Sequence, residues 1–314
     1  MAYLPFYLTP EELALKQKQQ EQEIATGRDQ IRWHKYDIEE PFRYYNYCIS
    51  IAVCLPGYLL AFVLFERGET FSNALMIGQA LFLSGLAYLM FGLDYRYDYT
   101  LSEKGLVVKK RRNMPRWVNS AAQVVAWFGA VVCVFMVATV GPMILAGAGG
   151  LILLSFTGLK RKPDEEAEVR IGHREDWLFV FYNKKRKVIQ FFHKFDWCFY
   201  RDTDRTKIFR SQDRGDSYLF FHSQSELEDM IERLSNQYQL ECIEVVEKKE
   251  IFVGKIEPKL LEFPARHLEF LKSELDGIKA RKTPPPRWEY LFDGEWRTKA
   301  EIEQLQSQAM VAEE

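Results

Sequence analysis

The sequence lacks the short motifs that mark common catalytic and nucleotide-binding sites. It contains no Walker motif, no GxGxxG after a strand, no HExxH and no GxSxG. No CxxC pair occurs among its five cysteines, which favours free packing thiols over disulfides. These absences predict a protein that is not an enzyme and has no metal or cofactor.

An excess of charge of one sign is also missing. The 42 Lys and Arg residues nearly balance the 44 Asp and Glu residues, for a net charge of −2, which excludes a globally basic nucleic-acid binder. Charged residues make up 27% and hydrophobic residues 47% of the chain, so it is not a disordered protein. The 314 residues are enough for two or three domains at roughly 100–200 residues each.

Long hydrophobic runs, in contrast, are present. Residues 44–65, 71–93 and 117–159 contain no Asp, Glu, Lys or Arg. The first two are close to the ~20 residues of one membrane-spanning helix, and the third is about twice that length, with a Gly-Pro pair at 141–142 in its middle. The pattern predicts four transmembrane helices in two hairpins, 44–93 and 117–159. The second hairpin could alternatively be re-entrant.

The basic residues that flank these runs fall on one side of such an arrangement, and the connections on the other side carry a single one, Arg67. Seven lie between the second and third runs, four lie within residues 28–43 before the first run and three directly follow the last. Because Lys and Arg favour the cytoplasmic side, the sequence predicts a multi-pass protein of the bacterial inner membrane with both termini in the cytoplasm.

The polar segments predict four further parts. Residues 1–43 form a cytoplasmic N-terminal segment with a helix from Pro10 to Ala25, opened by a capping box at Thr9 and Glu12. Residues 94–116 form a basic loop or β-hairpin and residues 160–256 a cytoplasmic β-rich domain. Residues 257–314 form a C-terminal helix, a proline spacer and a small docking module.

The sequence pattern of the β-rich domain predicts an antiparallel meander closed by an amphipathic helix. Short aromatic and β-branched runs lie between turn-forming residues from 168 to 222, including a turn at 213–216. Phe195, Trp197 and Phe199 alternate with polar or small residues, as in a strand covered on one face. Ser223 then opens a helix that reaches Tyr238. The predicted fold class is therefore a membrane α-helical protein with a cytoplasmic α+β domain.

The pattern weakens beyond residue 240. It predicts strands at 242–246 and 251–256 and a helix over 258–282. A small hairpin turns at Asp293-Gly294, and a second capping box at Thr298 opens a terminal helix.

The segment from Tyr97 to Leu106 reads Tyr-Asp-Tyr-Thr-Leu-Ser-Glu-Lys-Gly-Leu and follows a predicted membrane hairpin. It resembles the opening strands of bacterial pleckstrin-homology-like membrane proteins, in which a pair of spans is followed by Tyr-x-Leu-Thr-x-x-x-Gly-Leu. The resemblance implies a curled antiparallel sheet closed by a helix, and a binding or assembly domain.

Three groups of residues are candidate sites. Basic residues near a bilayer surface can each contribute ~1 kcal/mol to binding of anionic headgroups, which makes a membrane lipid a predicted partner. The candidates for this contact are Lys109, Lys110, Arg111, Arg112 and Arg116. The small residues predicted to pack helices closely are Gly129, Gly147, Gly149 and Gly150. Three histidines of the meander match no metal-binding signature, and they are His173, His193 and His222.

These features predict a bacterial inner-membrane anchoring or scaffold protein. Its cytoplasmic β-rich domain would bind a protein partner or self-associate within a larger secretion, conjugation or envelope assembly. Two alternatives remain open. One is a small oligomeric channel or permease built on the Gly-rich spans. The other is a membrane enzyme acting on lipid, with His173, His193 or His222 as acid or base.

Overall fold

The computed structural model describes residues 4–68, 70–88, 94–114, 120, 127, 167–252 and 258–313. The chain divides into two units. The first comprises residues 1–43, 96–110 and 168–314, and the second comprises residues 44–95 and 111–167.

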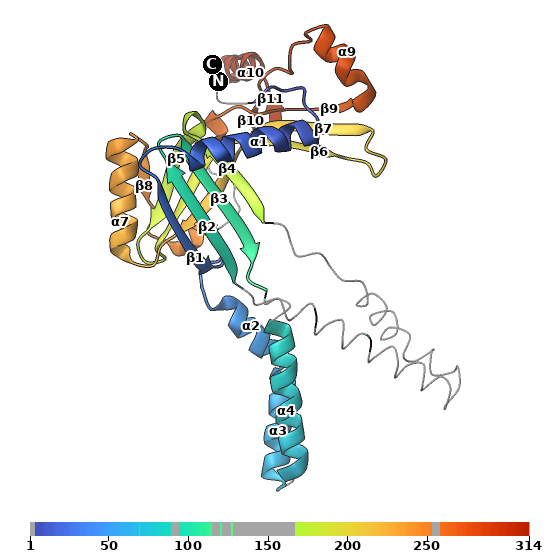
Figure 1. Cartoon of the computed structure of the whole chain (residues 1–314), viewed down its shortest axis with the longest axis vertical. Coiled ribbons are helices and arrows are strands. Elements are labelled where there is room, and N and C mark those ends of the chain that lie inside the picture. Colours follow the sequence, from blue (N-terminus) through green and yellow to red (C-terminus); the bar gives the residue numbers. More distant parts are fainter. Residues whose placement is uncertain are drawn as a thin grey trace, which may run out of the picture. The chain divides into compact units, whose positions relative to one another are not determined.

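The first unit begins with helix α1 (Pro10–Ala25) (Figure 1). Both hydrogen bonds of the capping box are present, because Glu12 N donates to the Thr9 hydroxyl and Thr9 N donates to the Glu12 carboxylate. These bonds satisfy two of the backbone N–H groups that a helix start leaves unpaired. The predicted N-terminal helix is therefore confirmed.

A four-stranded sheet follows, in the order β1 (Ile31–Asp37), β2 (Tyr95–Ser102), β3 (Gly105–Arg112) and β4 (Glu168–His173). Strand β3 pairs antiparallel with β4. The predicted basic loop or hairpin thus forms strands that join β1 and β4, and it contributes none to the later meander.

The second sheet has five strands, in the order β8-β5-β6-β7-β9. Strands β5 (Trp177–Asn183), β6 (Val188–Tyr200) and β7 (Lys207–Phe220) form the predicted antiparallel meander. Strand β8 (Cys242–Glu244) adds parallel to β5, and β9 (Arg266–Leu271) adds antiparallel to β7. Helix α7 (Gln224–Glu232) starts at the Ser223 cap and continues as the π-helical turn η3 (Arg233–Gln237), which confirms the predicted amphipathic helix.

The two sheets are joined by buried aromatic side chains. The Tyr99 hydroxyl donates to the carbonyl of Tyr218 (3.0 Å) and accepts from the backbone N–H of Phe220 (3.2 Å). The Trp33 indole donates to the carbonyl of Phe220 (3.1 Å) and stacks on Tyr99. Burial raises the pKa of Tyr99 well above its usual value, so this hydroxyl stays protonated. Buried apolar clusters of the first unit centre on Phe179, Phe181 and Phe192 and on Ile208, Phe270 and Leu275.

Strands β6 and β7 pair without a break from Val188–Phe220 to Tyr200–Ile208. The turn predicted at 213–216 is wrong, because these residues lie within β7 opposite residues 192–195 of β6. Four residues of turn-forming type adopt strand geometry here because the ladder continues on both sides of them. Strand preference depends on such context more than on residue type.

Two other predictions beyond residue 240 are wrong. The segment predicted as a helix over 258–282 forms η4 (Pro258–Glu262), β9, η5 (Lys272–Glu274) and α9 (Leu275–Ala280). Of the strand predicted at 251–256, the first two residues end helix α8 (Lys248–Phe252), and the other four lie outside the described residues. In the first case, pairing of β9 with the edge of β7 outweighs a weak helical periodicity.

The predicted hairpin at Asp293-Gly294 and the terminal helix after Thr298 are confirmed. Strands β10 (Tyr290–Phe292) and β11 (Glu295–Arg297) form a hairpin. Asp293 and Gly294 both have positive φ, at 50° and 81°, as a two-residue turn of this type requires. Helix α10 (Lys299–Glu313) follows, and Thr298 N donates to the Glu301 carboxylate (2.7 Å).

The second unit contains helices α2 (Tyr45–Val53), α3 (Leu55–Glu66) and α4 (Thr70–Ala87). Pro56 lies at the start of α3, where its missing N–H and ring prevent a continuous helix with α2. Residues 45–52 and 55–63 would together be long and apolar enough to cross a bilayer, but they are bent by 48°. In the described part of the chain, no single helix meets both criteria.

The predicted fold class of four continuous transmembrane helices is therefore corrected, and with it the multi-pass inner-membrane localisation that it implied. The physical reason in the first predicted span is the break before Pro56. The described fold is α+β, with antiparallel sheets as its main feature. The second predicted hairpin, at 117–159, lies outside the described residues apart from residues 120 and 127.

Candidate partner-binding face

The far end of the β6–β7 hairpin carries aromatic rings on one face. We call residues 195–200 and 207–213 the distal hairpin, and Phe195, Trp197, Phe199 and Phe209 its aromatic face. Phe195 contacts Trp197 edge-on at 4.8 Å between ring centroids, and Phe199 lies 5.2 Å from Phe209. Trp197 is 52% exposed and Phe199 is 45% exposed. The pairing of Phe199 with Phe209 across the ladder keeps these rings on one surface.

Polar side chains, some of them on strand β9, lie at the border of this aromatic face. The His267 ring lies between Phe209 and Trp296, at centroid distances of 6.3 and 6.1 Å. Arg201 forms an ion pair with Glu269 (2.7 Å) at the same side of the sheet. An aromatic centre with a polar, solvated border is the composition that protein–protein interfaces favour.

The opposite face of the distal hairpin is organised by Arg210, whose side chain is completely buried. Its Nε donates to the carbonyl of Phe6 (3.1 Å), and its Nη1 donates to the carbonyls of Trp197 and Ser211 (both 3.0 Å). Its Nη2 donates to the carbonyl of Pro5 (3.3 Å) and pairs with the Asp196 carboxylate. All five N–H donors of the guanidinium therefore have an acceptor, which makes burial of this charge tolerable.

Gln212 extends this network to the N-terminal segment. Its Nε2 donates to the carbonyl of Leu4 (2.6 Å) and to Asp196 (3.1 Å), while its Oε1 accepts from Nε of Arg266 (2.7 Å). The thiol of Cys198 donates to the carbonyl of Leu8 (3.4 Å), and burial raises its pKa to about 11. Residues 4–8 thus lie across the polar face of the hairpin, held through their own backbone.

The alternation of Phe195, Trp197 and Phe199 with polar or small residues predicts a strand with one covered face, and the structure confirms it. The covered side is the side of Asp196, Cys198 and Arg210, and the exposed side is aromatic. Sequence reasoning singled out none of the residues of the polar network. A signal was available in part, because Asp196, Arg210 and Gln212 share one face of the predicted hairpin. Their backbone partners, however, lie about 200 positions earlier in the chain.

Two of the basic residues predicted to contact lipid headgroups form ion pairs within the first unit. Lys109 pairs with Glu21 of α1 (2.5 Å), and Lys110 pairs with Glu39 (2.9 Å). Arg111 and Arg112 end the same strand. Arg116 lies outside the described residues, as do the predicted packing residues Gly129, Gly147, Gly149 and Gly150.

The three histidines of the meander take separate roles. His193 is buried, with Nε2 bonded to the Ser217 hydroxyl (3.0 Å) and Nδ1 to the carbonyl of Lys194 (2.9 Å). Burial lowers the pKa of His193, so its ring is neutral. His222 bonds to the carbonyl of His34, and His173 ends β4. Within the described ranges, no three His, Cys, Asp or Glu residues are placed to hold a metal ion.

Exposed Trp and Phe side chains on a β-ladder are a composition that is enriched at protein–protein interfaces. The chain belongs to the TsiV2 immunity protein family, whose model matches residues 9–256. It is similar to the immunity protein TsiV2 of Vibrio cholerae serotype O1, with 33% identity over 110 residues. This match covers 34% of the chain and 44% of the relative, so the chain spans less than half the relative's length. No solved structure matches.

The family overturns two predictions. The resemblance to pleckstrin-homology-like membrane proteins is wrong, because its short motif is common in strands and the family model matches most of the chain. The predicted membrane scaffold, channel and lipid-acting enzyme are likewise overturned by membership of an immunity protein family. Membership agrees with the predicted protein partner and gives no support to a lipid partner. The aromatic face lies inside the matched range, whereas residues 4–8 and 258–313 lie outside it.

Proposed function

We propose that this protein protects its host by binding a cognate toxin protein, and that the aromatic face of the distal hairpin forms the centre of the contact. The observation that carries the proposal is the exposure of Trp197 and Phe199 within the range that the family model matches. Membership of an immunity protein family, and the similarity to the immunity protein TsiV2 of Vibrio cholerae, suggest the kind of partner.

The energetics of such a face fit a dominant contact. Truncation of a central aromatic residue at an interface often costs about 2 kcal/mol or more, or about 30-fold in affinity. The face is also rigid, because the Arg210 network fixes the strand from behind. A rigid aromatic surface loses little side-chain and loop entropy when a partner binds. Protection in this proposal comes from binding alone, without catalysis.

The test is competition between sibling cells. A strain that lacks this gene should be killed by its toxin-producing parent, and the wild-type gene should restore survival. The double variant Trp197→Ala/Phe199→Ala should fail to restore it, since both rings leave the centre of the contact. The control Phe71→Ala removes a ring that is 83% exposed on helix α4 of the second unit, and it should protect like the wild type.

The two parts of the proposal fail separately. Unchanged survival of the deletion strain would reject toxin immunity as the function. Full protection by the double variant would reject the aromatic face and leave immunity standing. Thermal unfolding of the purified double variant at the wild-type temperature confirms that a loss of protection reflects the surface.

A further inference from the structure

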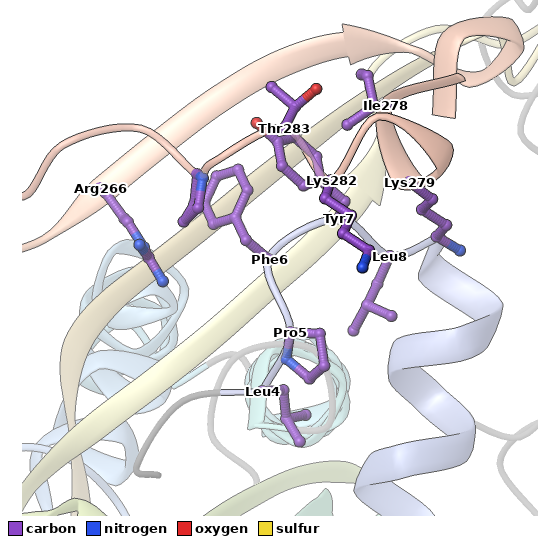
Figure 2. A pocket seen from close by; sticks show the side chains of 11 residues that line it. Leu4, Pro5, Phe6, Tyr7, Leu8, Arg266, Ile278, Lys279, Lys282 and Thr283 are labelled. Atoms are coloured by element: carbon purple, nitrogen blue, oxygen red, sulfur yellow. The ribbon is translucent and has the colours of Figure 1, made fainter. Parts of the chain in front are cut away.

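A pocket of about 720 Å³ is lined on one side by the N-terminal segment from Leu4 to Leu8 (Figure 2). Its other wall includes Ile278 of α9 and the loop that follows, which lie above the segment in this view. Its volume is in the range of pockets that bind small ligands, which is about 300–1,000 Å³. It shares no residue with the aromatic face and lies outside the range of the family model.

The peptide planes of the segment direct two backbone N–H groups toward the pocket. The carbonyl oxygens of Pro5 and Phe6 both accept from the guanidinium of Arg210 (3.3 and 3.1 Å), which does not line the pocket. These peptide bonds are trans, so the N–H that follows each carbonyl points the opposite way. The N–H groups of Phe6 and Tyr7 therefore face away from Arg210, on the side of the segment where the pocket lies.

Neither of these N–H groups has an acceptor in the described part of the chain. Phe6 is only 5% exposed, and nearly all buried backbone N–H groups in folded proteins do have an acceptor. The two groups are therefore suited to an acceptor from outside the chain. Adjacent N–H groups that face the same way match the two oxygens of a carboxylate, and hydrogen bonds to an ionised acceptor are the stronger kind.

The pocket also offers positive charge and an apolar lining. Within the described ranges, the ammonium group of Lys282 forms no hydrogen bond or ion pair, whereas Lys279 pairs with Glu12 (2.9 Å) and Arg266 donates to Gln212 (2.7 Å). The apolar lining residues include Leu4, Pro5, Leu8, Ile278 and Pro285. A ligand that matches these features joins a single anionic group to an apolar body.

We propose that this pocket binds a carboxylate at the end of an apolar chain. The carboxylate oxygens accept from the N–H groups of Phe6 and Tyr7, Lys282 balances the charge, and the apolar chain contacts the remaining lining. Fatty acids and peptides with an apolar C-terminal residue both present this chemistry, and the experiment distinguishes them. The site goes beyond the proposed function, because neither the aromatic face nor a toxin takes part.

Isothermal titration calorimetry of the full chain with decanoate tests the carboxylate. We expect saturable binding that is at least tenfold tighter than that of decanol, which has the same chain without the negative charge. Lys282→Gln should weaken decanoate binding about threefold or more, because it removes the charge and keeps a polar side chain. The control Lys18→Gln removes an exposed charge from α1 and should bind decanoate like the wild type.

A matched pair of variants tests the backbone donors. Tyr7→Ala and Tyr7→Pro both remove the Tyr7 ring and its hydrogen bond to the carbonyl of Pro284, but only proline also removes the N–H. We expect Tyr7→Pro to bind decanoate about tenfold more weakly than Tyr7→Ala, because one hydrogen bond to a charged group is lost. Thermal unfolding of both variants checks the fold. Lys282→Gln, at an exposed residue, keeps the proposal testable if proline unfolds the segment.

Three results would overturn the proposal. The first is binding of decanol as tight as that of decanoate. The second is equal binding of decanoate by folded Tyr7→Ala and Tyr7→Pro, and the third is equal binding by wild type and Lys282→Gln. Competition then identifies the source of the carboxylate. Stronger competition by acetyl-Leu-Leu-Leu than by decanoate would assign the site to a peptide C-terminus, and the reverse would assign it to a fatty acid.

Discussion

The two halves of the β6–β7 hairpin have similar aromatic content and opposite surroundings. In the half nearest β5, Phe191 and Phe192 are buried on the two faces of the sheet, and Ile189 is completely buried. In the distal hairpin, Trp197 and Phe199 are exposed, while Arg210 on the other face is completely buried. An aromatic strand can therefore be core at one end and surface at the other along one uninterrupted ladder.

The difference shows that alternation along a strand identifies two faces but does not say which is covered. In the near half, packing of apolar side chains covers both faces. In the distal half, hydrogen bonds from Arg210 and Gln212 to backbone carbonyls of residues 4–6 cover the polar face. The predictions below test this contrast, from the largest expected effect to the smallest.

Removal of the buried charge of Arg210 should cause the largest loss of stability. Arg210→Met leaves the largely buried Asp196 carboxylate without its cationic partner and frees the carbonyls of Pro5 and Phe6. We expect the free energy of unfolding to fall by about 3–5 kcal/mol, as for other buried pairs that lose one member. Urea unfolding followed by tryptophan fluorescence measures it. Arg201→Met removes an exposed pair with Glu269 and should cost less than about 1 kcal/mol.

Asp176 should respond to pH in an unusual direction. Its carboxyl is buried, its Oδ1 has no hydrogen-bond partner among the described residues, and burial followed by the charge of Asp196 raises its pKa to about 8. The unfolded chain ionises near pH 4, so this group lowers the free energy of unfolding as pH rises from about 4 to 8.

Asp176→Asn cannot ionise and should therefore raise the free energy of unfolding at pH 7 by about 1–4 kcal/mol. The gain should disappear near pH 4, where the carboxyl is protonated in both states. Urea titrations at pH 4, 5.5 and 7 measure the change. An identical gain at all three values would contradict the assigned pKa.

Matched truncations should separate the two halves of the hairpin. Phe191→Leu in the near half removes buried ring atoms and should cost about 1–1.5 kcal/mol. Trp197→Leu in the distal half removes atoms that are largely in water and should change the free energy of unfolding by less than about 0.5 kcal/mol. Chemical denaturation of both variants provides the comparison. Equal costs would mean that the aromatic face is covered in solution.

A glycine substitution tests the continuity of the ladder, with the smallest expected effect. Gly215 lies in β7 opposite His193, and an added Cβ would meet only ordinary contacts, 3.7 Å from Phe195. Gly215→Ala should therefore change the free energy of unfolding by less than about 0.5 kcal/mol. If residues 213–216 formed the turn that the sequence predicts, a positive φ at this glycine would make the cost larger. Gly105→Ala, whose Cβ would lie 2.6 Å from the carbonyl oxygen of Gly172, should be clearly destabilising.

Local chemistry explains which elements could be predicted from sequence. The caps at Thr9, Ser223 and Thr298 and the Asp293-Gly294 turn are set by neighbouring residues, and all are present. The meander is also local, since its strands follow one another in the chain. Strand β9 and the polar network depend on partners that are distant in sequence, so no local sequence pattern predicts either of them.

The candidate site was predictable only in its residue types. The alternation of Phe195, Trp197 and Phe199 was visible, and so was the expectation of a protein partner. Residues 4–8 cover the opposite, polar side, and sequence analysis gave no structural role to these residues within the N-terminal segment. The prediction of continuous transmembrane helices from the charge-free runs was wrong for a different reason. Residue composition alone does not show that Pro56 separates α3 from α2.

The docking of residues 4–8 has a consequence for how the chain is made. The carbonyls of residues 4–6 accept hydrogen bonds from Arg210 and Gln212 of β7, which are synthesised about 200 residues later, and Arg266 and the carbonyl of Pro284 follow later still. During synthesis at roughly 5–20 residues per second, the segment must wait many seconds for its binding site. Until then it is residues 4–8 that have no partner surface, and a chaperone that holds them open would favour their docking once β7 has been made.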